Sequence, residues 1–112
     1  SPDGLVMENG KYVGAVEIKC PNTKTHVNYI RLNRMPSAYK YQIFMYFIVV
    51  DTLEWLDFVS WDDRLSVAPM HIIRIKREDI LSELAEAETK IEEFIAKKDK
   101  YLDKVLELKQ IW

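Results

Sequence analysis

The sequence predicts an α/β fold, in which helices pack on a mixed β-sheet and a long helix ends the chain. Two strand-like runs come first, at residues 5–7 and 12–18, and an apolar helical stretch follows at residues 37–50. Two further strand-like runs occupy residues 53–61 and 70–76. A strand pair, a crossover helix and two more strands together favour a sheet with both parallel and antiparallel neighbours.

The first twenty residues predict a β-hairpin that turns at Asn9-Gly10, because Asn-Gly between β-type runs is a strong hairpin signal. A regular two-residue turn there would place Asp3 opposite Val16, on the wrong face to meet Glu17. We therefore expect an odd-length loop or a β-bulge, either of which would bring Asp3 opposite Glu17.

Asp3, Glu17 and Lys19 form a candidate catalytic group. Glu17 and Lys19 are two apart on a strand, so their side chains leave the same face roughly 7 Å apart. Paired carboxylates hold Mg²⁺, which prefers oxygen ligands and keeps several waters. A bound metal polarises a phosphoryl oxygen and lowers the pKa of its water, and a nearby lysine can orient or deprotonate that water.

The Glu-x-Lys pattern is not specific by itself, because it also occurs at Glu88 and Glu107 on a predicted solvent-exposed helix. An ordinary charge pair on an edge strand is therefore the alternative interpretation of Glu17 and Lys19. The apolar residues on both sides of Glu17 favour a functional role, because charges among apolar side chains need compensation.

Composition limits the class of protein. A chain of 112 residues with 48% hydrophobic residues suits one globular core, and we treat residues 1–112 as a single domain. Residues 1–76 would form the sheet and its helix, and residues 77–112 the C-terminal helix. Cys20 is the only cysteine, which excludes an internal disulfide and favours a reducing compartment such as the cytoplasm. No apolar run approaches the roughly 20 residues of a membrane helix, so we expect no membrane partner.

The chain starts without Met, directly on the predicted site strand. Because chain termini fray, a site at the third residue is unusual. We interpret the sequence as a fragment of a longer chain.

Basic residues concentrate between residues 19 and 50, where no Asp or Glu occurs: Lys19, Lys24, Arg31, Arg34 and Lys40. A basic segment beside an acidic site suits a polyanion, and a solvated loop is the alternative. Residues 22–36 are polar and turn-prone, which predicts a loop that contains His26.

The helix predicted at residues 37–50 carries Tyr39, Gln42 and Tyr46 on one stripe. Gln42 stands out because the residues that follow it are nearly all apolar. We expect it either to bond a loop carbonyl or to orient the lysine, water or phosphate. Lys40, beside the stripe, would meet a backbone phosphate or solvent.

The chain from about Glu78 onward predicts a helix of about 30 residues, longer than most globular helices. Its apolar residues follow heptad-like spacing with one lapse at Lys98, which suits packing along the sheet or against another subunit. The stripe comprises Ile80, Leu84, Ala87, Ile91, Phe94, Tyr101, Val105 and Leu108. His71 fits a packed strand histidine.

Three motifs in this order resemble the phage lambda exonuclease and YqaJ-type viral recombinase family. They are Ser1-Pro2-Asp3-Gly4, then Glu17-Ile18-Lys19-Cys20-Pro21, then Ser37-Ala38-Tyr39-Lys40-Tyr41-Gln42. The resemblance continues to about Asp79, and the helix beyond it matches in length and character. This family belongs to the PD-(D/E)xK nucleases, so the resemblance implies a restriction-endonuclease-like fold.

The resemblance further implies hydrolysis of DNA phosphodiesters with Mg²⁺, for which Mn²⁺ can substitute. Asp3 and Glu17 would ligate the metal together with the backbone carbonyl of Ile18, and Lys19 would activate the attacking water. Gln42, with Tyr39, would hold Lys19 or the nucleophile.

Family members degrade duplex DNA from 5′ ends and leave a 3′ single strand for annealing. The resemblance therefore implies double-stranded DNA ends, a trimeric ring of subunits and a single-strand annealing protein as partners, in the cytoplasm of a host cell. Relatives also carry helices before the Pro-Asp-Gly strand, which this sequence lacks, so we expect the chain alone to be inactive.

Two other functions fit the same residues. An endonuclease or junction resolvase would use the same metal chemistry without a pocket for DNA ends. A non-catalytic module would instead assemble through the long helix, with Glu17 and Lys19 as a structural ion pair.

Overall fold

The computed structural model describes residues 1–110; residues 111 and 112, the end of the predicted C-terminal helix, lie outside the described residues. The elements in chain order are β1 (Gly4–Glu8), β2 (Lys11–Lys19), α1 (Thr23–Leu32), α2 (Lys40–Val49), β3 (Trp55–Trp61), β4 (Met70–Lys76) and α3 (Leu81–Gln110). Short 3₁₀ turns precede α2, at Ser37–Tyr39, and α3, at Arg77–Asp79.

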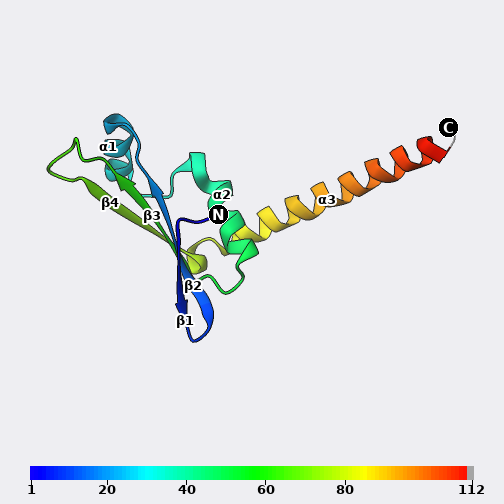
Figure 1. Ribbon diagram of the computed structural model, residues 1–112, viewed down its shortest axis with the longest axis horizontal. Coiled ribbons are helices and arrows are strands. Elements are labelled where there is room, and N and C mark those ends of the chain that lie inside the picture. The colour runs from blue at the N-terminus through cyan, green and yellow to red at the C-terminus, as the bar shows by residue number, and fades with distance from the viewer. Residues whose placement is uncertain (111–112) are drawn as a thin grey trace.

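The strands form one mixed sheet in the order β1-β2-β3-β4. The two outer pairs are antiparallel, and the central pair, β2 and β3, is parallel. Parallel neighbours need a crossover connection, which α1 and α2 supply between β2 and β3 (Figure 1). The predicted mixed sheet with flanking helices and a long C-terminal helix is confirmed.

The hairpin turns at Asn9-Gly10, as predicted. Both residues have positive φ, 50° and 77°, which is the backbone of a two-residue type I′ turn. Glu8 therefore pairs with Lys11 across the turn. A regular ladder from this pair would put Asp3 on the wrong face of the sheet.

A β-bulge in the middle of the hairpin corrects the position of Asp3. The register shifts by one residue between the turn and the start of β1, so that Gly4 pairs with Val16. The next position along the ladder sets Asp3 level with Glu17. Of the two devices expected from the sequence, the structure uses the bulge.

One face of the sheet packs against helices. The side chains of alternate residues on β2, β3 and β4 enter this core, together with the buried inner face of α2. Tyr29 of α1 and Tyr39 before α2 both pack against Phe58 of β3, with ring centroids 5.4 and 5.5 Å apart. The buried core comprises Ala15, Ile43, Phe44, Phe47, Leu53, Leu56, Phe58, Ile73, Ile75, Ile80 and Leu84.

The loop predicted at residues 22–36 is wrong, because residues Thr23–Leu32 form α1. The Asn22 side chain caps the helix by accepting a 2.9 Å hydrogen bond from the Thr25 amide. Asn33 ends the helix in the left-handed conformation, with φ of 47°. Asparagine favours both turns and helix caps, so in the sequence these two residues look like turn signals. This is why the sequence predicts a loop here.

His26, expected in that loop, is instead fully buried on α1. Its Nε2 lies 2.8 Å from the Ala68 carbonyl oxygen, and its Nδ1 lies 2.7 Å from the Ser60 hydroxyl. Because a carbonyl only accepts, Nε2 donates to Ala68, and in the neutral imidazole Nδ1 then accepts from Ser60. The histidine thus joins α1 to β3 and to the loop before β4.

The remaining elements follow the prediction with small changes at their ends. The helix expected at residues 37–50 begins as a 3₁₀ turn and continues as α2, and β4 covers the predicted residues. β3 begins at Trp55 rather than at Leu53, whose side chain is buried in the connection from α2. The C-terminal helix starts at Leu81, after the turn at Arg77–Asp79.

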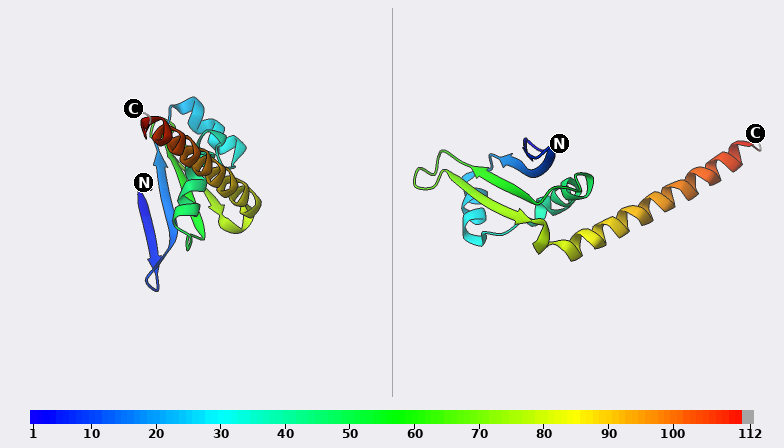
Figure 2. Two further views of the ribbon diagram at one scale, coloured as in Figure 1. Left: turned by 90° about the vertical axis from the view of Figure 1, so that its right-hand side faces the viewer. Right: turned by 90° about the horizontal axis from the view of Figure 1, so that it is seen from below.

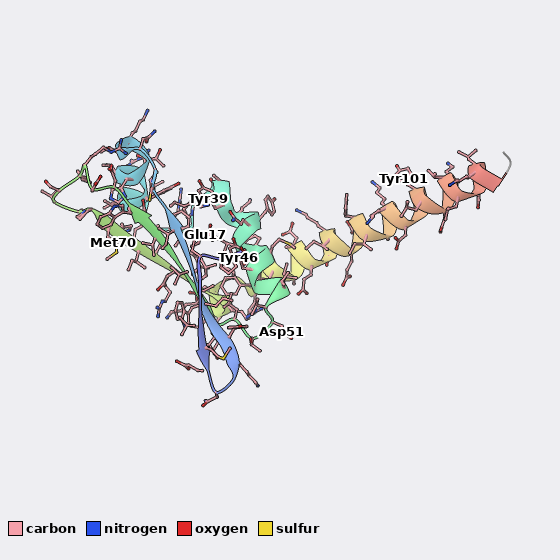
Figure 3. All side chains as sticks on the ribbon, viewed as in Figure 1. Glu17, Tyr39, Tyr46, Asp51, Met70 and Tyr101 are labelled. Atoms are coloured by element: carbon pink, nitrogen blue, oxygen red, sulfur yellow. The ribbon has the colours of Figure 1, made fainter. Side chains whose placement is uncertain are left out.

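Helix α3 packs on the domain only at its beginning. Leu84 is buried and Ala87 lies against the core, whereas Phe94 and Tyr101 are 69% and 66% exposed. Figure 1 and the right-hand view of Figure 2 show α3 running well beyond the sheet, and Figure 3 labels Tyr101 on its distant part. Among residues 1–110, no helix has the length and apolar character to cross a membrane.

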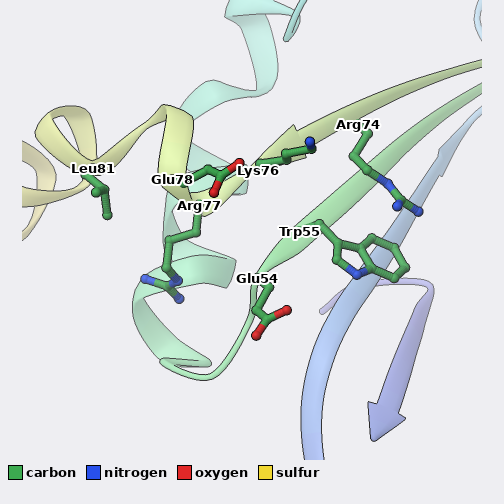
Figure 4. Close-up of a pocket in the computed structure, with 7 residues that line it drawn as sticks. All are labelled: Glu54, Trp55, Arg74, Lys76, Arg77, Glu78 and Leu81. Carbon is green, nitrogen blue, oxygen red and sulfur yellow. The ribbon is translucent and has the colours of Figure 1, made fainter.

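Arg77 holds the end of α2 against the sheet. Its guanidinium donates to the carbonyl oxygens of Phe47, Val50 and Leu53, at 2.6, 3.1 and 2.6 Å. These carbonyls belong to the end of α2 and to the segment after it, where a helix leaves acceptors unsatisfied. Arg77 and Trp55 both line a hollow of about 560 Å³, and Figure 4 shows these two side chains with the other lining residues.

We expect Arg77→Leu to lower the free energy of unfolding by about 2–3 kcal/mol, because it removes a charged donor from three carbonyl acceptors. Urea denaturation followed by circular dichroism measures this loss. Lys76→Ala, which removes an exposed neighbouring cation, is the control and should change stability by less than about 0.5 kcal/mol. Equal stability of the two variants would contradict the capping role of Arg77.

Candidate active site

Glu17 is the centre of the candidate site. It lies on β2, beside the parallel strand β3, and alternation along the strand turns it toward the helix-covered face, where it is 5% exposed. Its Oε1 lies 3.1 Å from Lys19 Nζ, and its Oε2 accepts a 3.1 Å hydrogen bond from the Tyr46 hydroxyl. Each carboxylate oxygen therefore has a donor, which offsets the loss of hydration of a buried charge.

Lys19 lies between Glu17 and an aromatic ring. Its ammonium nitrogen is 4.7 Å from the centroid of the Tyr39 ring, and 27% of its side chain is exposed. The hydrogen bond to Glu17 raises the pKa of Lys19, and partial burial opposes this shift. The ammonium form is thus favoured in this arrangement. Tyr39, which the sequence suggested as a holder of Lys19, contacts it directly.

Asp3 joins the site through the backbone of β2. Its Oδ2 accepts a 2.7 Å hydrogen bond from the Ile18 amide, and its own amide donates to the Val16 carbonyl at 2.9 Å. The Asp3 side chain therefore takes the place of a main-chain acceptor at the end of the ladder. This bond brings its carboxylate to the residue between Glu17 and Lys19.

Gln42 reaches the group through a residue that the sequence analysis did not select. Its Nε2 donates a 2.9 Å hydrogen bond to the Tyr46 hydroxyl, which in turn donates to Glu17. Within residues 1–110, no hydrogen bond joins Gln42 to Lys19 or to a loop carbonyl. Figure 3 shows Tyr39 and Tyr46 on the same side of the sheet as Glu17.

The sequence did contain a signal for Tyr46, because Tyr46 follows Gln42 by four residues and lies on the same helical stripe. Burial raises the pKa of the Tyr46 hydroxyl, the hydrogen bond from Gln42 lowers it, and the bond to Glu17 raises it further. The hydroxyl therefore remains a protonated donor at neutral pH.

The predicted DNA-binding cations lie outside this cluster. Lys24, Arg31 and Arg34 are exposed on or just after α1, and Arg31 bonds Asn28 of its own helix at 3.4 Å. Lys40 lies 5.0 Å from the Tyr41 ring centroid. Tyr39 is the one predicted DNA-binding residue that touches the site in the described part of the chain.

The donor set fits a hard divalent cation. Two carboxylates, Asp3 just before β1 and Glu17 on β2, flank the backbone of Ile18. No group of three or more His, Cys, Asp or Glu side chains with metal-binding geometry occurs among residues 1–110. Mg²⁺ needs only one or two carboxylates because it keeps several waters, so the small acidic set is consistent with this ion.

A family model matches the first part of the chain, where these residues lie. Residues 1–52 match the YqaJ-like viral recombinase domain. The predicted resemblance to the YqaJ-type viral recombinase family is thereby confirmed. The matched segment includes Asp3, Glu17, Lys19, Gln42 and Tyr46. Curated proteins gave no significant match.

Two solved structures resemble the chain over most of its length. The crystal structure of LHK-Exo in complex with dAMP is 35% identical, with a TM-score of 0.61. The crystal structure of an alkaline exonuclease (LHK-Exo) from Laribacter hongkongensis is 34% identical, with a TM-score of 0.58. Each match covers 89% of this chain and 54% of the solved chain, so this chain spans about half the length of these exonucleases.

We expect the Lys19 ammonium to titrate above its usual pKa of 10.5, because deprotonation would break its hydrogen bond to Glu17. The ion pair would be fully formed below pH 10.5 and lost as the pH rises through the higher folded pKa. Lysine ¹³Cε chemical shifts measured against pH report this value. Glu17→Gln should lower it, and an unchanged Lys19 titration in that variant would contradict the pairing.

Proposed function

We propose that this chain is the core of a Mg²⁺-dependent DNA exonuclease that degrades duplex DNA from 5′ ends in recombination. The supporting observation is the position of the Asp3 carboxylate on the Ile18 amide, beside the buried Glu17–Lys19 pair. The similarity to an alkaline exonuclease, one structure of which binds the deoxynucleotide dAMP, supports DNA as the substrate.

In this proposal, Asp3 and Glu17 hold Mg²⁺ together with the Ile18 carbonyl. When bound, the ion would lower the pKa of a water and neutralise charge that develops on the phosphate. Lys19, as an ammonium, orients the attacking water and offsets charge on the phosphate, and the Tyr39 ring confines the ammonium group beside Glu17. Gln42 contributes from α2 through Tyr46.

The proposed partners are double-stranded DNA ends, further copies of the chain in a trimeric ring, and a single-strand annealing protein. The exposed apolar stripe of α3, including Phe94 and Tyr101, supports assembly with another protein surface. The single exposed Cys20 suits a reducing compartment, and we propose the cytoplasm.

An endonuclease or junction resolvase is the second candidate, because the same carboxylates and lysine would serve it. The substrate distinguishes the two activities. An exonuclease degrades linear duplex DNA and spares covalently closed circles, whereas an endonuclease cuts both.

We expect Asp3→Ala or Lys19→Ala in the full-length protein to abolish Mg²⁺-dependent hydrolysis of linear duplex DNA and to leave folding intact. Removing a metal ligand or the group that activates water takes away transition-state stabilisation. Release of acid-soluble nucleotides measures the rate, and circular dichroism checks the fold. Asp51→Ala and Lys76→Ala, at exposed positions away from the site, are the matched controls.

Hydrolysis that persists in either site variant would contradict the nuclease assignment. A non-catalytic assembly module predicts no hydrolysis in any variant, including the wild type. The same measurement therefore separates the enzyme from the structural alternative.

The basic segment makes a separate prediction about binding. If Arg31 and Arg34 contact phosphates, replacing each with Ala should reduce the slope of log binding constant against log salt by about one unit. Fluorescence anisotropy with a labelled duplex measures the slope between low and physiological salt. Lys76→Ala, on the opposite face of the sheet, is the control and should leave the slope unchanged. An unchanged slope in the Arg31 and Arg34 variants would show that these side chains meet solvent and not phosphates.

A further inference from the structure

Tyr46 occupies a position in the site to which the sequence motifs assign no role. Its hydroxyl lies between Gln42 and Glu17, accepting from the Gln42 amide at 2.9 Å and donating to Glu17 Oε2 at 3.1 Å. We infer that Tyr46 is a positioning residue for Glu17 and that Gln42 acts on the site only through the Tyr46 hydroxyl. This inference rests on the proposed metal site.

The direction of the hydrogen bonds follows from counting protons. A tyrosine hydroxyl has one proton to donate, and an ionised carboxylate has none. If the Gln42 carbonyl oxygen faced Tyr46, two acceptors would compete for that proton and one would remain unpaired. With the Gln42 nitrogen facing Tyr46, the Tyr46 hydroxyl accepts from Gln42 and donates its own proton to Glu17 Oε2.

The Tyr46 hydroxyl is held in place by helix α2. Gln42 and Tyr46 are one helical turn apart on α2, so their side chains lie on the same stripe. Ile43, Phe44 and Phe47 of the same helix are buried in the core, which fixes α2 against the sheet. Packing therefore sets the height of the Tyr46 hydroxyl above Glu17, independently of any ligand.

Glu17 depends on this donor because solvent hardly reaches it. Its side chain is only 7% exposed, so water cannot freely replace a missing hydrogen bond at Oε2. With Oε2 bound to Tyr46 and Oε1 paired to Lys19, the carboxylate has one orientation. Loss of the hydroxyl would release this orientation, and groups that orient metal ligands commonly change metal affinity by about 10–100-fold.

A direct role for Gln42 is the competing explanation, because Gln42 is exposed and its amide could also meet a water or a phosphate. The two explanations differ in one measurable way. If Gln42 acts through Tyr46, removing the Gln42 side chain has no further effect once the Tyr46 hydroxyl is gone.

The test measures Mn²⁺ binding to the full-length protein without DNA, by electron paramagnetic resonance of the free ion. The variants are Tyr46→Phe, Gln42→Ala and the double variant. Tyr41→Phe is the matched control, because Tyr41 is an exposed tyrosine on the same helix that packs edge-on against Phe44. We expect Tyr46→Phe to weaken binding about tenfold or more, Gln42→Ala to weaken it less, and Tyr41→Phe to leave it unchanged.

A second readout needs no metal. In the metal-free protein, the effects of Tyr46→Phe and Glu17→Gln on the urea midpoint should be non-additive, because Tyr46→Phe removes the donor of one hydrogen bond and Glu17→Gln removes the charge of its acceptor. Gln42→Ala changes an exposed residue, and if Gln42 acts through Tyr46 its effect should also be non-additive with that of Glu17→Gln, which keeps the test valid even if Tyr46→Phe fails to fold.

The outcomes separate the two proposals. If wild-type protein binds Mn²⁺ and Asp3→Ala removes binding, the metal site stands. Binding by Tyr46→Phe equal to that of Tyr41→Phe would then overturn the inference alone. A Gln42→Ala effect that persists in the Tyr46→Phe background would overturn the relay. Additive effects of Tyr46→Phe and Glu17→Gln would overturn the positioning role, whereas wild-type protein without Mn²⁺ binding would overturn the proposed function together with it.

Discussion

The buried carboxylate of Glu17 is the constraint on which the rest of the site depends. An isolated charge in a core is strongly unfavourable, so a glutamate at this depth requires donors on every side that solvent does not reach. One donor is Lys19, two residues further along β2, and the other is Tyr46 of α2. The helix and the strand must therefore keep their relative position for the charge to be tolerated. The stability of the core and the geometry of the site are consequently coupled.

The hairpin brings a second carboxylate, that of Asp3, from the edge of the sheet to the backbone beside Glu17. A regular ladder from the Asn9-Gly10 turn would send Asp3 to the wrong face, because side chains alternate with every residue. One extra residue in the ladder reverses the face, and the Asp3 carboxylate then bonds the Ile18 amide. The bulge is thus the feature of the hairpin that brings Asp3 to the backbone between Glu17 and Lys19.

The helices are distributed unevenly over the molecule. Both α1 and α2 contact the face that holds Glu17, through Tyr29, His26 and Tyr46, whereas Trp61 and Ile72 on the other face remain partly exposed. Helix α3 extends far from the sheet with large apolar side chains in contact with solvent (Figures 1 and 3). The proposed assembly with another protein surface depends on these exposed apolar side chains of α3.

The sequence alone determined the strands, the apolar helix, the long C-terminal helix and the Asp3, Glu17 and Lys19 group, because hydrophobic periodicity and turn chemistry are local properties. It also limited Asp3 to a bulge or an odd loop. Tertiary structure decided which of these occurs, how α1 forms between Asn22 and Asn33, and which partner Gln42 binds. These choices depend on packing between segments that are distant in the chain. In a sequence, an asparagine that caps a helix looks the same as one that forms a turn. No local pattern specifies the contact between Tyr46 and Glu17, which are 29 residues apart.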